Sequence, residues 1–405
     1  MDQPLWRWDA TALAAAIRTR KLSSREATQA VLGRLEAVNP KLNAVTVVLA
    51  EPALAAADRA DAALRRGEAP GLLHGVPVTI KENVDQEGQA TANGVVAFKD
   101  VIAATDSPQV AAWRRAGAVI VGRTNTPAFS LRWHTDNDLR GRTFNPWHRD
   151  RTPGGSSGGC AAALAAGIAP LGHGNDLGGS VRYPAYCCGV AGIRPTLGRL
   201  AAYNATVLEE RPVGTQLMSV QGPLARRVGD VRLGLAAMAT RDPHDPWWVP
   251  APLEGPPIAR PIRVALTVDP AGQGVHSDVA AAVRAAGAAL ADAGYAVEEV
   301  EPPDVAGVAR CWSAIVINEL RHVTQPYIRQ HGGTDINRSL DFTLAGTPDV
   351  DLLGLPATAV PVGRAGGVPM GVQVIGSRYR EDLTLDAAEV IEARHGLPTP
   401  IDPAP

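Results

Sequence analysis

Short apolar runs of strand length alternate with alanine-rich runs of helix length along most of this sequence. The clearest unit is a strand at 262–268, a helix at 277–293 and a strand at 295–300. Further strands are expected at 44–49, 75–80 and 118–122, with helices at 52–66 and 108–117 between them. Strands that alternate with helices pack as one sheet between two helical layers. The pattern predicts an α/β fold with a central mixed, largely parallel sheet covered by helices on both faces.

A chain of 405 residues is long enough for one large α/β domain or for two ordinary ones. No internal repeat stands out, and most of the chain reads as a single domain, 1–405. Its parts are N-terminal helices at 1–70, a core at 71–230, the strand–helix–strand unit with peripheral helices at 262–342, and a C-terminal core segment at 352–395. Ser23 and Glu26 form a capping-box pattern that predicts a helix start and a helix that ends near Pro40.

The composition excludes several classes of partner. Charged residues make up 20% and the net charge is −2, so nothing favours nucleic acid or an anionic membrane. The N-terminus has no secretory signal pattern, and no apolar run approaches the length of a membrane span. The four cysteines fit no zinc spacing and are expected as free thiols. These features predict a cytoplasmic protein.

Two similar glycine-rich loops, separated by an alanine-rich stretch, each present a serine. Ser156 lies in Pro-Gly-Gly-Ser-Ser-Gly-Gly, and Ser180 lies in Asp-Leu-Gly-Gly-Ser-Val-Arg. Glycine permits positive φ and lets the backbone approach a ligand closely. Small neighbours also expose a hydroxyl nucleophile and the N–H groups that would stabilise an oxyanion. Flexible surface turns are the alternative interpretation.

A serine hydroxyl needs a base, and Lys81 is a candidate. None of the nine histidines lies in a recognisable triad context, and no Gly-x-Ser-x-Gly motif is present. A lysine can act as the base when burial lowers its pKa and leaves it neutral. Lys81 follows the apolar run 75–80, at the end of an expected buried strand. The alternative is a solvated charge at a strand end.

Three motifs together resemble the amidase signature family. They are Gly-Val-Pro-Val-Thr-Ile-Lys81-Glu-Asn, Thr-Pro-Gly-Gly-Ser156-Ser-Gly-Gly and Asn-Asp-Leu-Gly-Gly-Ser180-Val-Arg-Tyr-Pro-Ala. The step from Ser156 to Ser180 also matches, as do 189–196, 219–226, 354–357 and 371–376. The resemblance covers almost the whole chain. Within the family, the chain resembles bacterial amidases, aryl acylamidases and urethanases. It implies the amidase signature fold and hydrolysis of amides without a metal or cofactor.

The resemblance implies a role for each matching residue. Ser180 is the expected nucleophile, Ser156 the bridging serine reached through a cis peptide from Gly155, and Lys81 the neutral base. The expected oxyanion donors are the backbone N–H groups of Leu177, Gly178, Gly179 and Ser180. The expected supporting residues are Gly155, Ser157, Asp176 and Arg182, for which ordinary turn contacts are the alternative.

The sequence also departs from the family pattern. His173 and Asn175 stand where the family usually has a small residue and Thr or Ser. The expected substrate pocket comprises Trp133, His134, His173, Tyr183 and Met218. For His173 the alternative is a satisfied, partly buried side chain. Around 343–351 the sequence is several tens of residues shorter than the family pattern. Either part of the substrate lid is deleted, or this sequence lacks residues that the natural chain has.

The leading functional hypothesis is a serine hydrolase of small amides, including aryl amides, carbamates (urethanes) and esters, acting as a monomer or homodimer. The alternative is the glutaminase (A-type) component of a tRNA-dependent amidotransferase complex, which shares the resemblance. A third hypothesis, a catalytically silent binding protein on the same fold, conflicts with the intact Lys81, Ser156 and Ser180.

Overall fold

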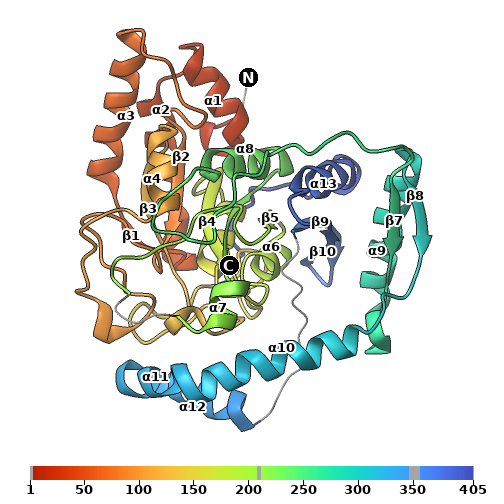
Figure 1. Cartoon of the computed structure of the whole chain (residues 1–405). Coiled ribbons are helices and arrows are strands. Elements are labelled where there is room, and N and C mark those ends of the chain that lie inside the picture. Colours follow the sequence, from red (N-terminus) through yellow and green to blue (C-terminus); the bar gives the residue numbers. More distant parts are fainter. Residues whose placement is uncertain (1–2, 208–210, 346–355, 405) are drawn as a thin grey trace.

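The computed structural model describes residues 3–207, 211–345 and 356–404. Its centre is an eight-stranded sheet with the order β1-β3-β2-β4-β6-β5-β9-β10 (Figure 1). The strands are β1 (Val45–Val48), β2 (Pro77–Lys81), β3 (Val119–Thr124), β4 (Leu171–Asp176), β5 (Ala191–Arg194), β6 (Val220–Ala225), β9 (Ala357–Ala365) and β10 (Val368–Ile375). Both the N-terminal and the C-terminal parts of the chain therefore contribute strands to one sheet.

The sheet is mixed, as expected, but it is not largely parallel. In the described sheet β2 is parallel to β3 and to β4, whereas every other pairing is antiparallel. Alternation of strands and helices does not fix strand direction. The next strand can begin at either end of the sheet, and this determines whether it runs parallel or antiparallel to its neighbour. For β9 and β10 the connection is a tight turn at Gly366 and Gly367, both with positive φ, which forces an antiparallel hairpin.

Helices cover both faces of the sheet. The helices of the main body are α1 (Ala10–Arg18), α2 (Ser24–Leu42), α3 (Ala50–Arg65), α4 (Pro108–Arg115), α5 (Gly158–Ala165), α6 (Arg182–Cys188), α7 (Val213–Met218), α8 (Val228–Met238) and α13 (Glu381–His395). One core cluster joins Ala225 to residues of α1, α4, α8 and α13, and a second joins the adjacent Leu224 to residues of α2, α5 and α6. Adjacent strand residues face opposite sides, so the two clusters fill the two faces.

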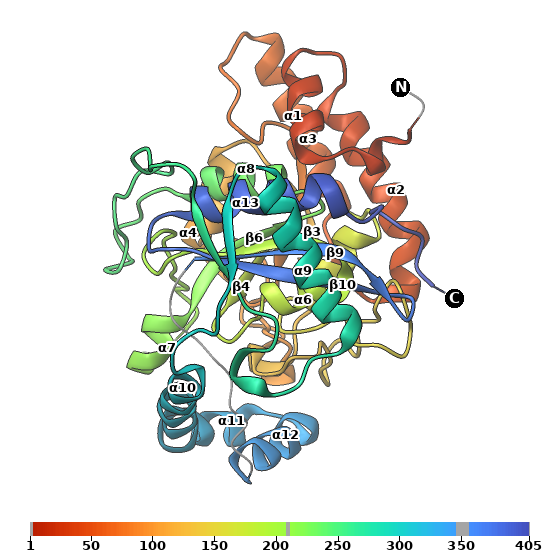
Figure 2. The same ribbon diagram turned by 90° about the vertical axis from the view of Figure 1, so that its right-hand side faces the viewer.

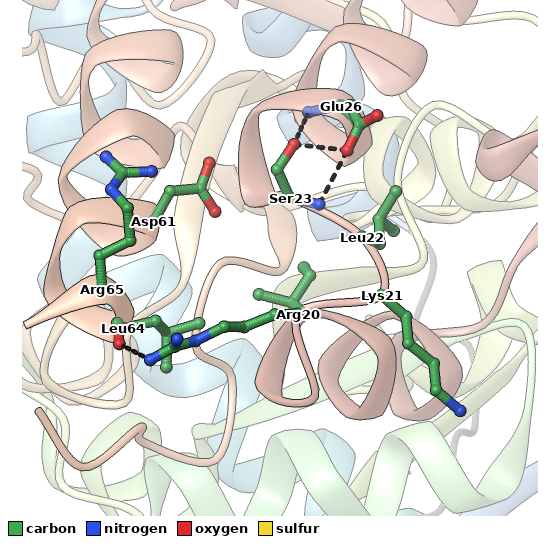
Figure 3. A pocket seen from close by; sticks show the side chains of 9 residues that line it. Arg20, Lys21, Leu22, Ser23, Glu26, Asp61, Leu64 and Arg65 are labelled. Atoms are coloured by element: carbon green, nitrogen blue, oxygen red, sulfur yellow. Dashed lines mark hydrogen bonds between the residues drawn. The ribbon is translucent and has the colours of Figure 1, made fainter. Parts of the chain in front are cut away.

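The expected capping box at the start of α2 is present. Ser23 Oγ accepts a hydrogen bond from Glu26 N at 3.1 Å, and Ser23 N donates to Glu26 Oε2 at 2.9 Å (Figure 3). The helix continues beyond its expected end near Pro40 to Leu42. The hollow drawn beside this cap is lined by residues of α1, α2 and α3 and of the turn between α1 and α2, and it holds none of the expected site residues.

Two peripheral parts follow the main body. The strands β7 (Arg263–Leu266) and β8 (Ala296–Glu299) form a separate parallel pair with α9 (Ser277–Asp292), as the sequence predicts. Next come α10 (Val305–Glu319), a π-helical turn (Leu320–Thr324), α11 (Gln325–His331) and α12 (Thr334–Ala345). Figures 1 and 2 show α10–α12 on the side of the molecule opposite α1 and α3. Most of the short junction at 343–351 lies outside the described residues.

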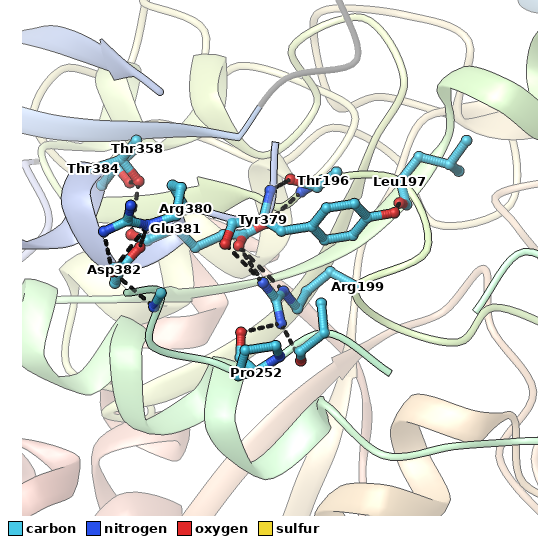
Figure 4. A network of polar contacts seen from close by, with 12 residues as sticks. Thr196, Leu197, Arg199, Pro252, Thr358, Tyr379, Arg380, Glu381, Asp382 and Thr384 are labelled. Atoms are coloured by element: carbon cyan, nitrogen blue, oxygen red, sulfur yellow. Dashed lines mark hydrogen bonds and ion pairs between the residues drawn. The ribbon is translucent and has the colours of Figure 1, made fainter. Parts of the chain in front are cut away.

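A buried ion pair ties the C-terminal segment to the main body (Figure 4). Arg199, in the loop after β5, donates to Glu381 at the start of α13, with Nη2 and Oε2 2.8 Å apart. The same carboxylate accepts from Thr196 N at 2.8 Å. The helix α13 is thus fixed directly to the loop that follows β5.

None of the helices within the described ranges combines the length and apolar character that a membrane span requires.

Candidate active site

The two serine loops lie against each other at the carboxyl ends of the inner strands β2 and β4. Ser156 precedes α5, Ser180 follows β4, and Ser157 N donates to Ser180 O at 3.1 Å. The expected cis peptide between Gly155 and Ser156 is present. A Cβ on Gly155 would collide with the main-chain oxygen of Arg132, so only glycine fits there. Both serines are nearly buried, at 1% and 8% exposure.

Lys81 lies at the end of β2 and points into these loops. Its Nζ is 2.7 Å from Ser156 Oγ, 3.2 Å from Ser157 Oγ and 2.7 Å from Asn175 Oδ1. The side chain is fully buried, and burial lowers its pKa to about 7, although the charge of Asp176 works in the opposite direction. The alternative of a solvated charge is wrong, because this amine lies inside the protein.

Asp176 organises the turn that carries Ser180. Its carboxylate accepts from Gly179 N at 2.8 Å, Val181 N at 3.0 Å and Arg182 Nη2 at 2.9 Å. Burial alone would raise the pKa of this carboxyl, but the charge and hydrogen bonds of Arg182 hold it below its ordinary value. An ionised Asp176 therefore holds the turn in place through these hydrogen bonds.

The expected oxyanion donors are not equivalent. The N–H of Gly179 is engaged by Asp176, whereas no hydrogen bond within the described chain uses the N–H groups of Leu177, Gly178 or Ser180. Residues 177–179 are partly open to solvent. Three of the four expected donors therefore have no partner among the described residues, and their oxyanion-binding role stays a prediction.

Comparison with known proteins decides the family. The amidase family profile matches residues 26–339. An indoleacetamide hydrolase from Bradyrhizobium diazoefficiens is 45% identical, over 97% of this chain and 88% of its own length. This chain belongs to the amidase signature family. It is an enzyme that hydrolyses amides.

Solved structures share the amidase fold over nearly the whole chain. A 6-aminohexanoate cyclic dimer hydrolase superposes with a TM-score of 0.78 and 26% identity, over 98% of both chains. A peptide amidase from Stenotrophomonas maltophilia, at 24% identity, has a TM-score of 0.79 over 98% of both chains. The expected amidase signature fold is confirmed. The alignment with the indoleacetamide hydrolase spans 459 positions, so that relative has residues that this amidase lacks.

The amidotransferase alternative is less well supported. The matching component of the glutamyl-tRNA(Gln) amidotransferase from Moorella thermoacetica is 36% identical, over 72% of this chain but only 60% of its own length. The indoleacetamide hydrolase is both more similar and more completely covered. Hydrolysis of small-molecule amides is therefore favoured over the glutaminase function.

Four of the five expected pocket residues have side chains that are exposed or partly buried. Trp133, His134 and Tyr183 are exposed, and Trp133 Nε1 donates to Gly178 O at 2.8 Å beside the free N–H groups. Met218 is partly buried, at the end of α7. These four remain candidate pocket residues.

His173 does not belong to the pocket. It is 0% exposed, with Nε2 2.9 Å from Gln221 Oε1 and its ring edge-on to Trp113. Burial lowers its pKa to about 3, so the ring is neutral. The position alone indicated closeness to the site, but β4 directs this side chain into the core beneath α4. The alternative of a satisfied, partly buried side chain is only partly met, because the ring is fully buried and its Nδ1 has no hydrogen-bond partner within the described residues.

Two site residues lacked an expected role. Asn175 contacts Lys81, and Asn83, two residues after Lys81, contacts Asn175. The available signal was that both asparagines lie at or just after the end of a strand. The structure places β2 and β4 side by side and parallel, so their carboxyl ends lie together. The sequence did not show that the two side chains pair.

Proposed function

We propose that this amidase cleaves small primary amides with an aromatic acyl group, such as indoleacetamide, through an acyl-enzyme on Ser180. The observation that carries the proposal is the buried contact of 2.7 Å between Lys81 Nζ and Ser156 Oγ. It supports a proton relay that needs no histidine. The sequence identity of 45% to an indoleacetamide hydrolase supports the substrate class.

In the acylation step, Ser180 Oγ attacks the carbonyl carbon and gives its proton to Ser156, whose own proton passes to neutral Lys81. The oxyanion is stabilised by the N–H groups of Leu177, Gly178 and Ser180, and each such donor typically lowers a barrier by about 3–4 kcal/mol. The proton then returns through Ser156 to the leaving nitrogen, and ammonia departs.

In the deacylation step, a water molecule attacks the acyl carbon and gives one proton to the same relay. The C–O bond to Ser180 breaks, the relay returns the proton to Ser180 Oγ, and the carboxylic acid leaves. The relay ends each cycle in its starting state. The same sequence applies to aryl carbamates and esters, which we propose as secondary substrates.

Two exposed aromatic side chains support an aromatic acyl group. Trp133 is held on the Ser180 loop through Gly178 O, and Tyr183 follows Ser180 by one helical turn, its N–H bonded to Gly179 O at 2.7 Å. Aromatic rings offer a large apolar surface to a flat ligand. His134 and Met218 are further candidates for the pocket.

The test is a comparison of kcat/KM for indoleacetamide, an aryl carbamate, a p-nitroanilide, a short aliphatic amide and glutamine. We expect the aromatic acetamide to be the best substrate and Ser180→Ala to abolish its hydrolysis with folding retained. Preference for glutamine would favour the amidotransferase alternative, and full activity of Ser180→Ala would contradict the mechanism. Light scattering decides whether the enzyme is a monomer or a homodimer.

A further inference from the structure

Asn83 and Asn175 form a reciprocal amide pair beside the catalytic lysine. Asn83 Nδ2 donates to Asn175 Oδ1 at 3.2 Å, and Asn175 Nδ2 donates to Asn83 Oδ1 at 3.0 Å. Asn83 Nδ2 also donates to Ser130 Oγ at 2.9 Å, and Ser130 in turn donates to Asn93 Oδ1 at 2.8 Å. This series of hydrogen bonds determines the positions of the oxygen and the nitrogen in each side-chain amide. The oxygen of Asn175, not its nitrogen, faces Lys81.

The orientation matters because the three oxygen neighbours of Lys81 differ in what they can donate. A protonated amine can donate to all three, whereas a neutral amine has two N–H donors and one lone pair that must accept. Asn175 Oδ1 carries no hydrogen and can only accept. Ser157 Oγ donates to the main-chain oxygen of Asn175 at 3.4 Å, so its proton is engaged.

Ser156 is then the remaining neighbour that can give a proton to the lone pair. A hydroxyl group at position 175 could compete, because it can donate as well as accept. The amide oxygen cannot compete while Asn83 holds it in place. The pair therefore directs the lone pair of Lys81 at Ser156, along the direction that the proton must travel.

We propose that Asn83 and Asn175 act as a positioning pair that aims the lone pair of neutral Lys81 at Ser156 and keeps the site next to the amine uncharged. The inference rests on the proposed relay and adds two residues to it. Neither residue touches the reacting carbonyl. Their effect passes through the geometry and charge state of the lysine.

Three titratable groups interact electrostatically with Lys81, and none of the three changes charge around neutral pH. Cys160, on α5, is buried, and burial raises its pKa to about 12. His173 is neutral for the reason given above, and Asp176, on β4, is ionised, held by Arg182. These three groups therefore do not account for a shift in activity around neutral pH, and a carboxylate at position 175 would be a new charge beside Lys81.

The first experiment replaces Asn175 with a carboxylate of the same shape. In Asn175→Asp the negative charge should favour the ammonium form, and an opposite charge within about 4–6 Å typically shifts a pKa by about 1–3 units. We expect the acidic limb of the kcat/KM profile for indoleacetamide to move up by at least about one pH unit, with activity recovering in alkaline buffer. The neutral control Asn175→Leu should lower kcat without that upward move.

The second experiment tests the pair without adding charge. Asn83→Ala keeps both contacts of Lys81 with the serines but frees the amide of Asn175 to turn. We expect kcat to fall about tenfold with KM unchanged, and the double variant with Asn175→Leu to be no slower than Asn175→Leu alone. Such non-additivity is the mark of two residues acting as a unit, and it decides the matter even if Asn175→Asp does not fold.

An acidic limb that stays at the wild-type position in folded Asn175→Asp would overturn the proposal, as would full activity of Asn83→Ala or multiplication of the two losses in the double variant. Failure of the underlying relay has a different signature. In that case Ser180→Ala or Lys81→Ala itself remains active, whatever the asparagine variants do.

Discussion

Lys81 combines a basic amine with complete burial, and this contrast determines the chemistry of the site. In water a lysine is protonated at neutral pH and cannot accept a proton. Here burial lowers its pKa to about 7, while Ser156, Ser157 and Asn175 supply hydrogen-bond partners in place of water. The enzyme thus obtains a base near neutral pH, and among the described residues no histidine side chain is hydrogen-bonded to either serine.

The activity should therefore fall in acid. The neutral amine is the active form, so kcat/KM should be constant well above about pH 7 and should fall tenfold for each pH unit well below it. A steady-state profile on indoleacetamide measures this. A rate that stays level down to pH 5 would show that no group of this pKa takes part.

The same pKa has a consequence for stability. Between pH 7 and about 10 the unfolded chain holds a proton on Lys81 that the folded protein has released, so the free energy of unfolding gains a contribution that rises with pH. Lys81→Met lacks this titration. Relative to that variant, the wild type should become more stable from pH 7 to pH 10, measured by urea unfolding. An equal pH dependence of the two proteins would contradict burial of a neutral amine.

At the level of elements, α11 and α12 pack on the loops that border the active site. Ile328 and Ile336 belong to one buried apolar cluster with Val95 and Ala128. Beside it, Phe98 and Phe129 form an aromatic cluster with Tyr327 and His331. Arg132, next to Trp133, pairs with Asp335. The α10–α12 region is thereby held against the segment that carries Ser130 and Trp133.

Shortening a buried side chain should loosen this contact. Ile328 is fully buried, and Ile328→Ala should cost about 2–5 kcal/mol at that contact. We expect faster amide hydrogen exchange across 320–344, with little change in β2 and β4. Val323→Ala, at a side chain that is 53% exposed, is the matched control. Equal exchange in the two variants would show that Ile328 does not anchor the region.

What the sequence could predict depends on how local the information is. Lys81, Ser156 and Ser180 lie in contiguous motifs, so each was found from its neighbours, together with the strand before Lys81. The Asn83–Asn175 pair was missed and His173 was wrongly placed near the pocket, because both depend on the direction of side chains in β4 relative to β2. The prediction of a largely parallel sheet was wrong for the same reason, since strand direction is set by contacts between distant segments.

At the scale of the whole molecule, distant parts of the chain are fixed to one another by buried charges. Arg199 and Glu381 are both almost inaccessible, and their pair joins α13 to the loop after β5 (Figure 4). Arg34, a buried residue on α2, also pairs with Asp402, an exposed residue near the C-terminus, with Nη1 and Oδ1 2.8 Å apart. The helix α13 and the segment after it are therefore fixed by contacts with the first half of the chain.

Removing one partner of the buried pair should destabilise the whole protein. Glu381→Gln leaves Arg199 buried without a compensating charge, which typically costs about 3–5 kcal/mol. The exposed pair Arg284–Glu299 provides the control, because water screens it and Glu299→Gln should change the free energy of unfolding far less. Denaturant unfolding distinguishes the two. A similar small effect for both would mean that the buried pair does not hold α13 in place.

The central claim is that Ser180 becomes acylated. Rapid acid quenching during turnover of indoleacetamide, followed by peptide mass spectrometry, should find the indoleacetyl group on the peptide that contains Ser180. The adduct should be absent in Ser180→Ala and should form much more slowly in Lys81→Met. An adduct on Ser156 instead, or continued turnover in Ser180→Ala, would contradict the assignment of Ser180 as the nucleophile and Ser156 as the relay.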